Sequence, residues 1–271
     1  MKEHLLSLAA AQPDPRRALN LVREYLQAHI LRSVQDAGGF AALAFQGGTA
    51  LRFLHGLRRF SEDLDFALER PGHDKGLRSL AGAVGRDLEL AGYDVELGIR
   101  TARSVQSADV KLPGLLAEAR LSAARGAKLM IRIEVDTRPP AGAVTETRLV
   151  TRHFPVNLRV HDLGSCLSGK IHALLARRYA KGRDLFDLAW YLTHPDRPEP
   201  NLALLKNALE QTGWNGPEVG KDTWRGIIED RIADLDWPAI TRDVEPFLED
   251  PGDRRLLDRD LLLSELRRRR S

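Results

Sequence analysis

Hydrophobic residues recur at helical spacing early in the chain. From Pro15 to Asp36, apolar side chains return every three or four residues, and two glycines follow the last of them. This spacing gathers the apolar side chains on one face of a helix, and glycine is common just past a helix end. The pattern therefore predicts a packing helix over residues 15–36. A similar pattern predicts a second helix from Lys75 to Ala91, which Gly92 ends.

A strand-like pattern lies between these two helices. The apolar run 41–45 leads into Gly47 and Gly48, and a short amphipathic segment then precedes a run in which Asp63 and Asp65 alternate with apolar residues. This order predicts a strand, a tight turn, a helix and a second strand. Side chains two positions apart on a strand project from the same face. Asp63 and Asp65 are therefore expected to point together.

The paired carboxylates and the glycine turn have a joint chemical use. Two neighbouring carboxylates repel each other, and half-burying them is costly unless a cation lies between them. Hard oxygen ligands of this kind suit Mg²⁺ carried by a nucleoside triphosphate. Gly47 and Gly48 let the backbone approach an anion closely, and a helix that begins near Thr49 offers free amide hydrogens to phosphate. Each feature alone is common in turns and on solvated strands, but their order and spacing together are more specific.

Together, Gly47-Gly48-Thr49 and Ser61-Glu62-Asp63-Leu64-Asp65-Phe66 resemble the AbiEii-like nucleotidyltransferase toxins, which include the MenT-type toxins of toxin–antitoxin pairs. Thr49 stands where the wider superfamily often has serine. The resemblance, over roughly residues 40 to 195, implies an α/β (α+β) fold: a polymerase-beta-like nucleotidyltransferase core with a mixed sheet, plus a helical C-terminal region. It also implies that Asp63 and Asp65 hold Mg²⁺, and that the nucleoside triphosphate is bound by Gly47, Gly48, Thr49 and Ser61.

A third carboxylate is expected from the stretch between Lys128 and Thr137. Here isoleucine and valine side chains alternate with Arg132, Glu134 and Asp136, which predicts a strand with one apolar face. The resembled superfamily carries its third acid on such a neighbouring strand. Glu134 is the first choice for that metal ligand, and Asp136 is the alternative. A polar outer face with an Arg132–Glu134 pair explains the same pattern equally well.

Further strands are predicted on either side of this stretch. Alternation predicts strands over 93–103 and 105–112. After the Pro-Pro-Ala-Gly break at 139–142, residues 148–156 alternate like an edge strand or an extended arm.

A second group of charged residues follows in two predicted helices. An apolar stripe that includes Leu167 and Ile171 predicts a helix to about Ala180 with Lys170 near its start. Gly182 is expected to separate it from a second helix, which carries two acids, Asp184 and Asp187.

This group also resembles the AbiEii-like family, in which a lysine opens a helix and an Arg-Asp-x-x-Asp-Leu run follows. Lys170 matches the motif lysine and Asp184 the motif aspartate, which implies that both are catalytic and that Lys170 also contacts the nucleotide. The lysine would neutralise the charge that builds up on the triphosphate. Asp184 would accept a proton from the attacking hydroxyl or hold Lys170 in place. Asp187 is expected to be structural.

Length and composition set the domain organisation. A chain of 271 residues, 43% hydrophobic and 29% charged, buries one large core or two modest ones. Residues 1–160 are expected to form the nucleotidyltransferase core with its N-terminal helices, and residues 161–271 a helical C-terminal region. Beyond the prolines at 195, 198 and 200, the pattern predicts three or four amphipathic helices.

The absence of targeting signals predicts a cytoplasmic location. No apolar run is long enough to span a bilayer, and the first residues lack a full secretory pattern. The single cysteine, Cys166, is consistent with a reducing compartment. No membrane partner is expected.

The distribution of charge bears on the acceptor. Net charge is only +3, yet the successive segments 138–160 and 161–183 are both rich in basic residues. Each run alone is typical of a solvated face, but two runs that flank a nucleotide site are also consistent with a polyanionic second substrate. The resemblance implies an RNA acceptor, with the 3′ end of tRNA as the expected site, and growth arrest that a cognate antitoxin counters.

Three alternatives to this function remain. A small-molecule nucleotidyltransferase, such as one that inactivates an aminoglycoside, would need an acidic acceptor pocket. A protein-modifying enzyme would label Ser, Thr or Tyr. A non-catalytic RNA-binding module would have no need of both Asp63 and Asp65.

Overall fold

The computed structural model describes residues 1–73, 75–124, 126–196, 198–233 and 235–268. It divides into two compact units. The first unit comprises residues 1–56, 60–139 and 146–160, and the second comprises residues 57–59, 140–145 and 161–271. Each unit is described below by itself.

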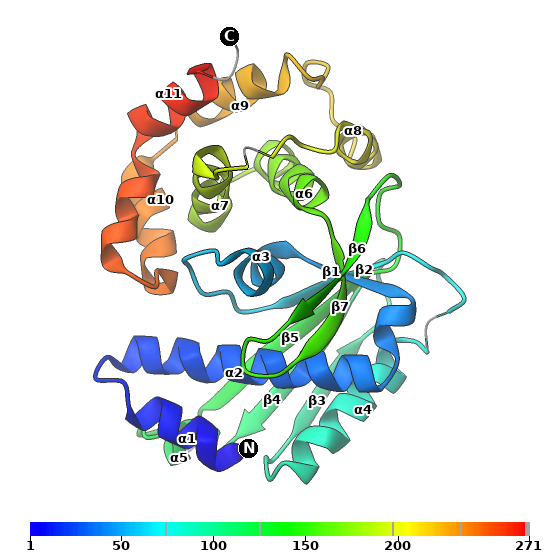
Figure 1. The fold of residues 1–271 in the computed structure, drawn as a ribbon, viewed down its shortest axis with the longest axis vertical. Coiled ribbons are helices and arrows are strands. Elements are labelled where there is room, and N and C mark those ends of the chain that lie inside the picture. The colour runs from blue at the N-terminus through cyan, green and yellow to red at the C-terminus, as the bar shows by residue number, and fades with distance from the viewer. Residues whose placement is uncertain (74, 125, 197, 234, 269–271) are drawn as a thin grey trace. The chain divides into compact units, whose positions relative to one another are not determined.

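The first unit is built on a mixed sheet. Its seven strands lie in the order β3-β4-β5-β2-β1-β7-β6 (Figure 1). The β1–β2, β3–β4 and β4–β5 pairs are antiparallel, the β2–β5 and β1–β7 pairs are parallel, and β6 is the edge strand beside β7. The strands span β1 Leu43–Gln46, β2 Leu64–Leu68, β3 Glu96–Arg100, β4 Val105–Pro113, β5 Lys128–Asp136, β6 Thr145–Val150 and β7 Val156–His161.

Helices α2 and α4 cover one face of this sheet (Figure 1). Proline at the first helical position and the Asp14 carboxylate, which accepts from the Arg16 amide at 3.0 Å, start α2. Its apolar stripe then buries Val22, Leu26 and Ile30. The helices of the unit are α1 Lys2–Ala10, α2 Pro15–Asp36, α3 Gly47–His55, α4 Leu77–Leu90 and α5 Leu115–Glu118, with a 3₁₀ turn, η1, over Gly39–Ala41.

Most elements of this unit agree with the sequence patterns. The predicted helix over 15–36, the strand–turn–helix–strand segment and the strand from Lys128 are confirmed. The edge strand or extended arm predicted over 148–156 has the wrong span, because β6, which does lie at the sheet edge, ends at Val150 and β7 begins at Val156. His153 between them has a φ of 63°, a left-handed conformation that cannot continue a strand.

The second unit is helical. Its helices are α6 Leu163–Ala176, α7 Gly182–Thr193, α8 Leu202–Gln211, α9 Trp224–Ala233, α10 Trp237–Val244 and α11 Arg259–Arg268, with 3₁₀ turns η2 Glu245–Phe247 and η3 Pro251–Leu257. The break at Gly182 and the amphipathic helices beyond Pro200 are confirmed.

The predicted span of the helix that carries Lys170 is wrong. The Asp162 carboxylate caps the Ser165 amide at 2.8 Å, so α6 begins earlier than expected and Lys170 lies in its middle. None of the described helices is both long and apolar enough to cross a membrane.

A buried charge cluster ties α2 to α3 and to the β6–β7 turn inside the first unit. The Glu24 carboxylate on α2 binds Arg52 of α3, and it accepts from Arg152 at 2.9 Å. His153 lies 3.3 Å from the same carboxylate. Burial by itself raises the pKa of Glu24, but the His153 hydrogen bond and the two arginine charges outweigh it and lower this pKa to about 2.

This depressed pKa predicts acid sensitivity. The ionised form of Glu24 stabilises the fold above pH 4.5, the ordinary pKa, and this stabilisation is lost as the pH falls towards 2. We expect Glu24 to contribute on the order of 3 kcal/mol to the acid-induced loss in the free energy of unfolding. Urea unfolding of the native protein and of Glu24→Gln at pH 6, 4 and 3 measures it. An equally steep loss in both proteins would assign the acid sensitivity to other groups.

Candidate active site

Three candidate site positions of the first unit lie in one row across the sheet. Asp65 of β2 has two register partners, Gln46 of β1 on one side and Glu134 of β5 on the other. Residues that pair directly across neighbouring strands project from the same face. The Asp65 and Glu134 carboxylates therefore share a face, and the glycine turn begins directly after Gln46. Asp63, one residue before β2, is half-buried like Asp65.

Gly47 lies directly against Asp65. Its φ is 79°, a left-handed conformation that side chains other than glycine rarely adopt. A Cβ atom built there would overlap the Asp65 carboxylate. The same residue opens α3, whose N-cap, Gln46, makes no side-chain capping bond. The backbone amides at this helix start therefore lie beside the carboxylate, which is the arrangement that a metal-bound phosphate requires.

Replacing Gly47 by alanine should remove most activity. The added Cβ strains the backbone by about 1–2 kcal/mol and displaces the Asp65 carboxylate. A displacement of about 1 Å in a positioning group costs about 100-fold in turnover. Gly56→Ala is the matched control, because Gly56 also has a positive φ, 68°, but has no neighbouring atom in the way of a Cβ. Melting temperatures and initial rates of the two variants separate strain from site geometry. Equal activity of both variants would show that the Gly47–Asp65 contact is unimportant.

Thr49 has a positioning contact. Its side chain is fully buried, and its hydroxyl donates to the backbone carbonyl of Asp63 at 2.5 Å. The hydroxyl thus holds the start of β2 in place and does not point to solvent, so any phosphate contact at this position falls to the backbone. Ser61 is half-buried, and its carbonyl accepts from Gln27 at 3.1 Å. Gly48 is buried in the first turn of α3.

The register favours Glu134 over Asp136 as the third acid. Glu134 pairs with Asp65, whereas Asp136 pairs with Ala67 and its carboxylate accepts from the Arg138 amide at 3.0 Å. The Arg132–Glu134 pair also exists, although at 3.9 Å it is loose.

No group of three or more His, Cys, Asp or Glu side chains is placed to hold a metal ion within the described ranges. Asp63 and Asp65 still fit Mg²⁺, because this ion is commonly held by one or two carboxylates together with substrate phosphates. Arg132 compensates part of the negative charge of these carboxylates, because it interacts electrostatically with Asp63 and Glu134.

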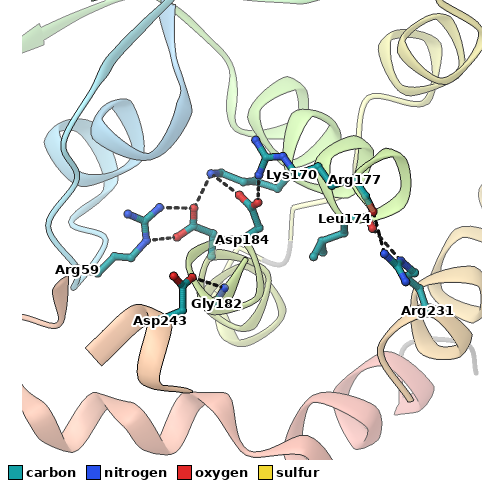
Figure 2. Close-up of polar contacts among 9 residues, drawn as sticks. Arg59, Lys170, Leu174, Arg177, Gly182, Asp184, Arg231 and Asp243 are labelled. Atoms are coloured by element: carbon teal, nitrogen blue, oxygen red, sulfur yellow. Dashed lines mark hydrogen bonds and ion pairs between the residues drawn. The ribbon is translucent and has the colours of Figure 1, made fainter. Parts of the chain in front are cut away.

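The second unit contains a network of ion pairs around Lys170 (Figure 2). The Lys170 Nζ atom lies 3.3 Å from Asp184 and 2.7 Å from Asp187, two acids one turn apart on α7. Arg177 at the end of α6 pairs with the other oxygen of Asp184. Arg59 donates from Nε and Nη2 to the two oxygens of Asp187, each at 2.6 Å. Positive and negative groups alternate along the whole network.

The network holds Lys170 charged. Burial lowers the pKa of the Lys170 ammonium, but the carboxylates of Asp187 and Asp184 outweigh burial, so this pKa is raised. Burial raises the pKa of Asp187, while Arg59 and Lys170 bring it below its ordinary value. Asp187 is completely buried, so its contacts are internal, in keeping with the structural role expected for it. Asp184 does hold Lys170, which was one of its two expected roles.

Arg59 was missed by the sequence analysis. It follows Arg58 in the connection after α3, and its partner Asp187 is 128 residues away. Its side chain is only 2% exposed, and a buried arginine requires an acid of similar burial. In the sequence, the need for a basic partner is indicated only by the two acids, Asp184 and Asp187, on the predicted helix after Gly182.

The basic residues of segments 138–160 and 161–183 are largely engaged. Arg148 pairs with Glu146, Arg152 with Glu24, and Arg177 with Asp184. Arg159 donates to the Ala41 carbonyl at 3.1 Å. These segments belong to different units, so the sequence run is not by itself a surface.

Comparisons with known proteins identify the family of this chain. The family model described as "Nucleotidyl transferase AbiEii toxin, Type IV TA system" matches residues 29–259. A search of curated proteins found no significant match.

Two solved structures share the fold at low sequence identity, and a third is similar over the whole chain at a lower score. The structure of JHP933 from Helicobacter pylori aligns with a TM-score of 0.55 and 19% identity, covering 92% of this chain and 94% of that one. A second H. pylori structure aligns with a TM-score of 0.56 and 20% identity, covering 92% and 96%. The nucleotidyltransferase toxin MenT4 from Mycobacterium tuberculosis aligns with a TM-score of 0.44 and 19% identity over 100% and 99% of the chains.

Proposed function

We propose a function that starts from the family to which this chain belongs, the AbiEii nucleotidyl transferase toxins of type IV toxin–antitoxin systems. In this proposal the protein transfers a nucleoside monophosphate from a nucleoside triphosphate to the 3′ end of an RNA, and tRNA is the expected acceptor. The observation that carries the proposal is the contact of Gly47 with Asp65, whose register partner is Glu134. A helix start for phosphate and carboxylates for a metal ion thus adjoin each other on one face of the sheet.

The reaction is an in-line displacement at the α-phosphorus. An acceptor hydroxyl oxygen forms the new bond to this phosphorus, the bond to the bridging oxygen of the β-phosphate breaks, and pyrophosphate leaves. The hydroxyl proton passes to a carboxylate of the site. Such a transfer depends mainly on positioning and on stabilisation of phosphate charge.

The expected site residues other than Ser61 each have a task in this proposal. The amides of the Gly47–Gly48 turn receive the phosphates, and Thr49 fixes the start of β2. Mg²⁺, when bound by Asp63 and Asp65, would neutralise the charge of the phosphates and orient them. Glu134, the register partner of Asp65, is the proposed third acid beside this pair. For Lys170 and Asp184, the proposal rests on the motif and on their network within the second unit: Lys170 contributes positive charge, and Asp184 keeps it oriented.

The biological role follows from the family. Blocking the 3′ end of tRNA would stop translation and arrest growth in the cytoplasm, and a cognate antitoxin is the expected partner.

Incubation of the purified protein with total RNA and each labelled triphosphate in turn tests the function. Label is expected in RNA with at least one triphosphate. Label only in proteins or in an added aminoglycoside would replace the RNA proposal with one of the other transferases.

A further inference from the structure

A basic hollow adjoins the candidate active site on the β5 side. It measures about 670 Å³, and its wall includes Arg100, Arg103, Val105, Ser107, Arg132 and Glu134. We call it the arginine hollow. The row Asp65–Glu134–Ser107–Arg100 runs into it strand by strand, because each residue is the register partner of the next. Glu134 therefore belongs to both the carboxylate row and the hollow.

A buried carboxylate orients two of these arginines. Asp109 on β4 accepts from Arg132 Nε at 2.7 Å through one oxygen and from Arg100 Nη2 at 2.6 Å through the other. Asp109 is only 4% exposed, whereas Arg100 is exposed and Arg132 half-exposed. Gly98 on β3 lies opposite Asp109 and has no side chain to block the approach of Arg100. Two arginines held by one acid leave a net positive charge.

The hollow and the glycine turn lie on opposite sides of Asp65. Gly47 follows β1, which borders β2 on one side, while Glu134 and the hollow begin with β5 on the other. If the triphosphate occupies the glycine turn with its α-phosphorus near Asp65, the hollow offers the second substrate an approach from the β5 side. This step rests on the function proposed above.

The chemistry of the hollow selects the second substrate. The described residues of its wall include three arginines and one acid, Glu134, so with Asp109 bound to two of the arginines the positive charges exceed the negative by one. This balance favours an anionic acceptor over a cationic one such as an aminoglycoside. Arginine binds phosphate through paired hydrogen bonds and stacks on nucleic-acid bases. We propose that the arginine hollow binds the phosphates of a single-stranded RNA 3′ end and guides its terminal hydroxyl towards Glu134 and Asp65.

The test uses the full chain with an Arg100→Ala, Arg103→Ala double variant. The probe is a short single-stranded RNA with a free 3′ hydroxyl, measured by fluorescence anisotropy across a salt series without triphosphate. We expect affinity at low salt to fall about tenfold or more, and the slope of log affinity against log salt to flatten by about 1.4. In transfer assays KM for RNA should rise, while KM for the triphosphate stays within about twofold.

Two further variants keep the result interpretable. Arg78→Ala, Arg86→Ala removes two exposed arginines of α4, which packs on the other face of the same sheet, and should leave RNA binding unchanged. Arg103→Glu alone alters an exposed residue of the β3–β4 turn and should weaken binding even if loss of the Arg100–Asp109 bond unfolds the double variant.

The outcomes separate this proposal from the proposed function. RNA affinity equal to that of the native protein in both Arg100/Arg103 and Arg103→Glu variants would overturn the hollow as the acceptor site. A rise in KM for the triphosphate alone would assign the arginines to the triphosphate instead, and would equally overturn it. Salt-dependent RNA binding that needs these arginines, in a protein that transfers no nucleotide, would support the hollow and refute the function.

Discussion

Asp65→Ala should lower nucleotide transfer by at least about 1,000-fold while the protein remains folded. The substitution removes one of the two carboxylates expected to hold Mg²⁺, and stabilisation of the phosphate charge depends on that ion. It also relieves repulsion from Asp63, so the melting temperature should hold or rise slightly. Single-turnover rates at saturating triphosphate, together with thermal unfolding, measure both effects.

Two milder variants sharpen this prediction. Asp65→Asn keeps the shape of the side chain and loses only its charge, so it should be nearly as inactive as alanine. Asp136→Asn is the matched control, because Asp136 is on the adjacent strand but pairs with Ala67 instead of Asp65. Near-normal transfer by Asp65→Ala would refute the metal assignment. Loss of activity in Asp136→Asn with retention in Glu134→Gln would make Asp136 the third acid.

Lys170→Ala should reduce turnover by orders of magnitude at a modest cost in stability. In this variant Asp184 keeps Arg177 and Asp187 keeps Arg59, so neither buried carboxylate is left without a cation. We expect a loss of about 1–3 kcal/mol in the free energy of unfolding. Lys170→Arg should also be impaired, because a forked guanidinium cannot take the place of a compact ammonium between two acids.

Asp187→Ala provides the contrast within the same network. It leaves the buried Arg59 guanidinium without the carboxylate that binds it through two hydrogen bonds, and breaking such a pair costs about 3–5 kcal/mol. The free energy of unfolding should therefore fall more in Asp187→Ala than in Lys170→Ala, as urea unfolding would show. If Lys170→Ala were the less stable of the two and kept its turnover per folded molecule, the lysine would be structural.

Local patterns predicted the elements that carry the first unit's site. The helix over 15–36 and the strand–turn–helix–strand segment follow from side-chain periodicity and from the Gly47–Gly48 turn, which are properties of neighbouring residues. The same periodicity predicts that Asp63 and Asp65 share a face, but Asp63 lies one residue before β2, so this part stays a prediction. The mixed seven-stranded sheet agrees with the fold that the motifs implied.

Pairings between distant residues could not be predicted in this way. The Arg59–Asp187 pair joins residues 128 positions apart, and the hold of Asp109 on Arg100 and Arg132 depends on the register of three strands. The split of 148–156 into two strands depends on one left-handed residue, His153, whose type gives little warning of it.

The start of α6 could have been predicted from the sequence, whereas the contact of the Thr49 hydroxyl could not. Asp162 is a good N-cap residue, and recognising it would have placed Lys170 in the middle of α6. The burial of Thr49 is different, because the hydroxyl that matched a phosphate-binding motif bonds instead to the Asp63 carbonyl, a partner that only the folded β2 provides.

The position of the label in the product tests the central claim most directly. The native protein and Asp65→Ala are each incubated with tRNA and Mg²⁺, in parallel with triphosphate labelled at the α-phosphorus or at the γ-phosphorus. Nucleotidyl transfer predicts that the native protein places the α label at the RNA 3′ end and releases the γ label as pyrophosphate, while Asp65→Ala does neither. Entry of the γ label into the acceptor, or equal labelling by both proteins, would contradict the account.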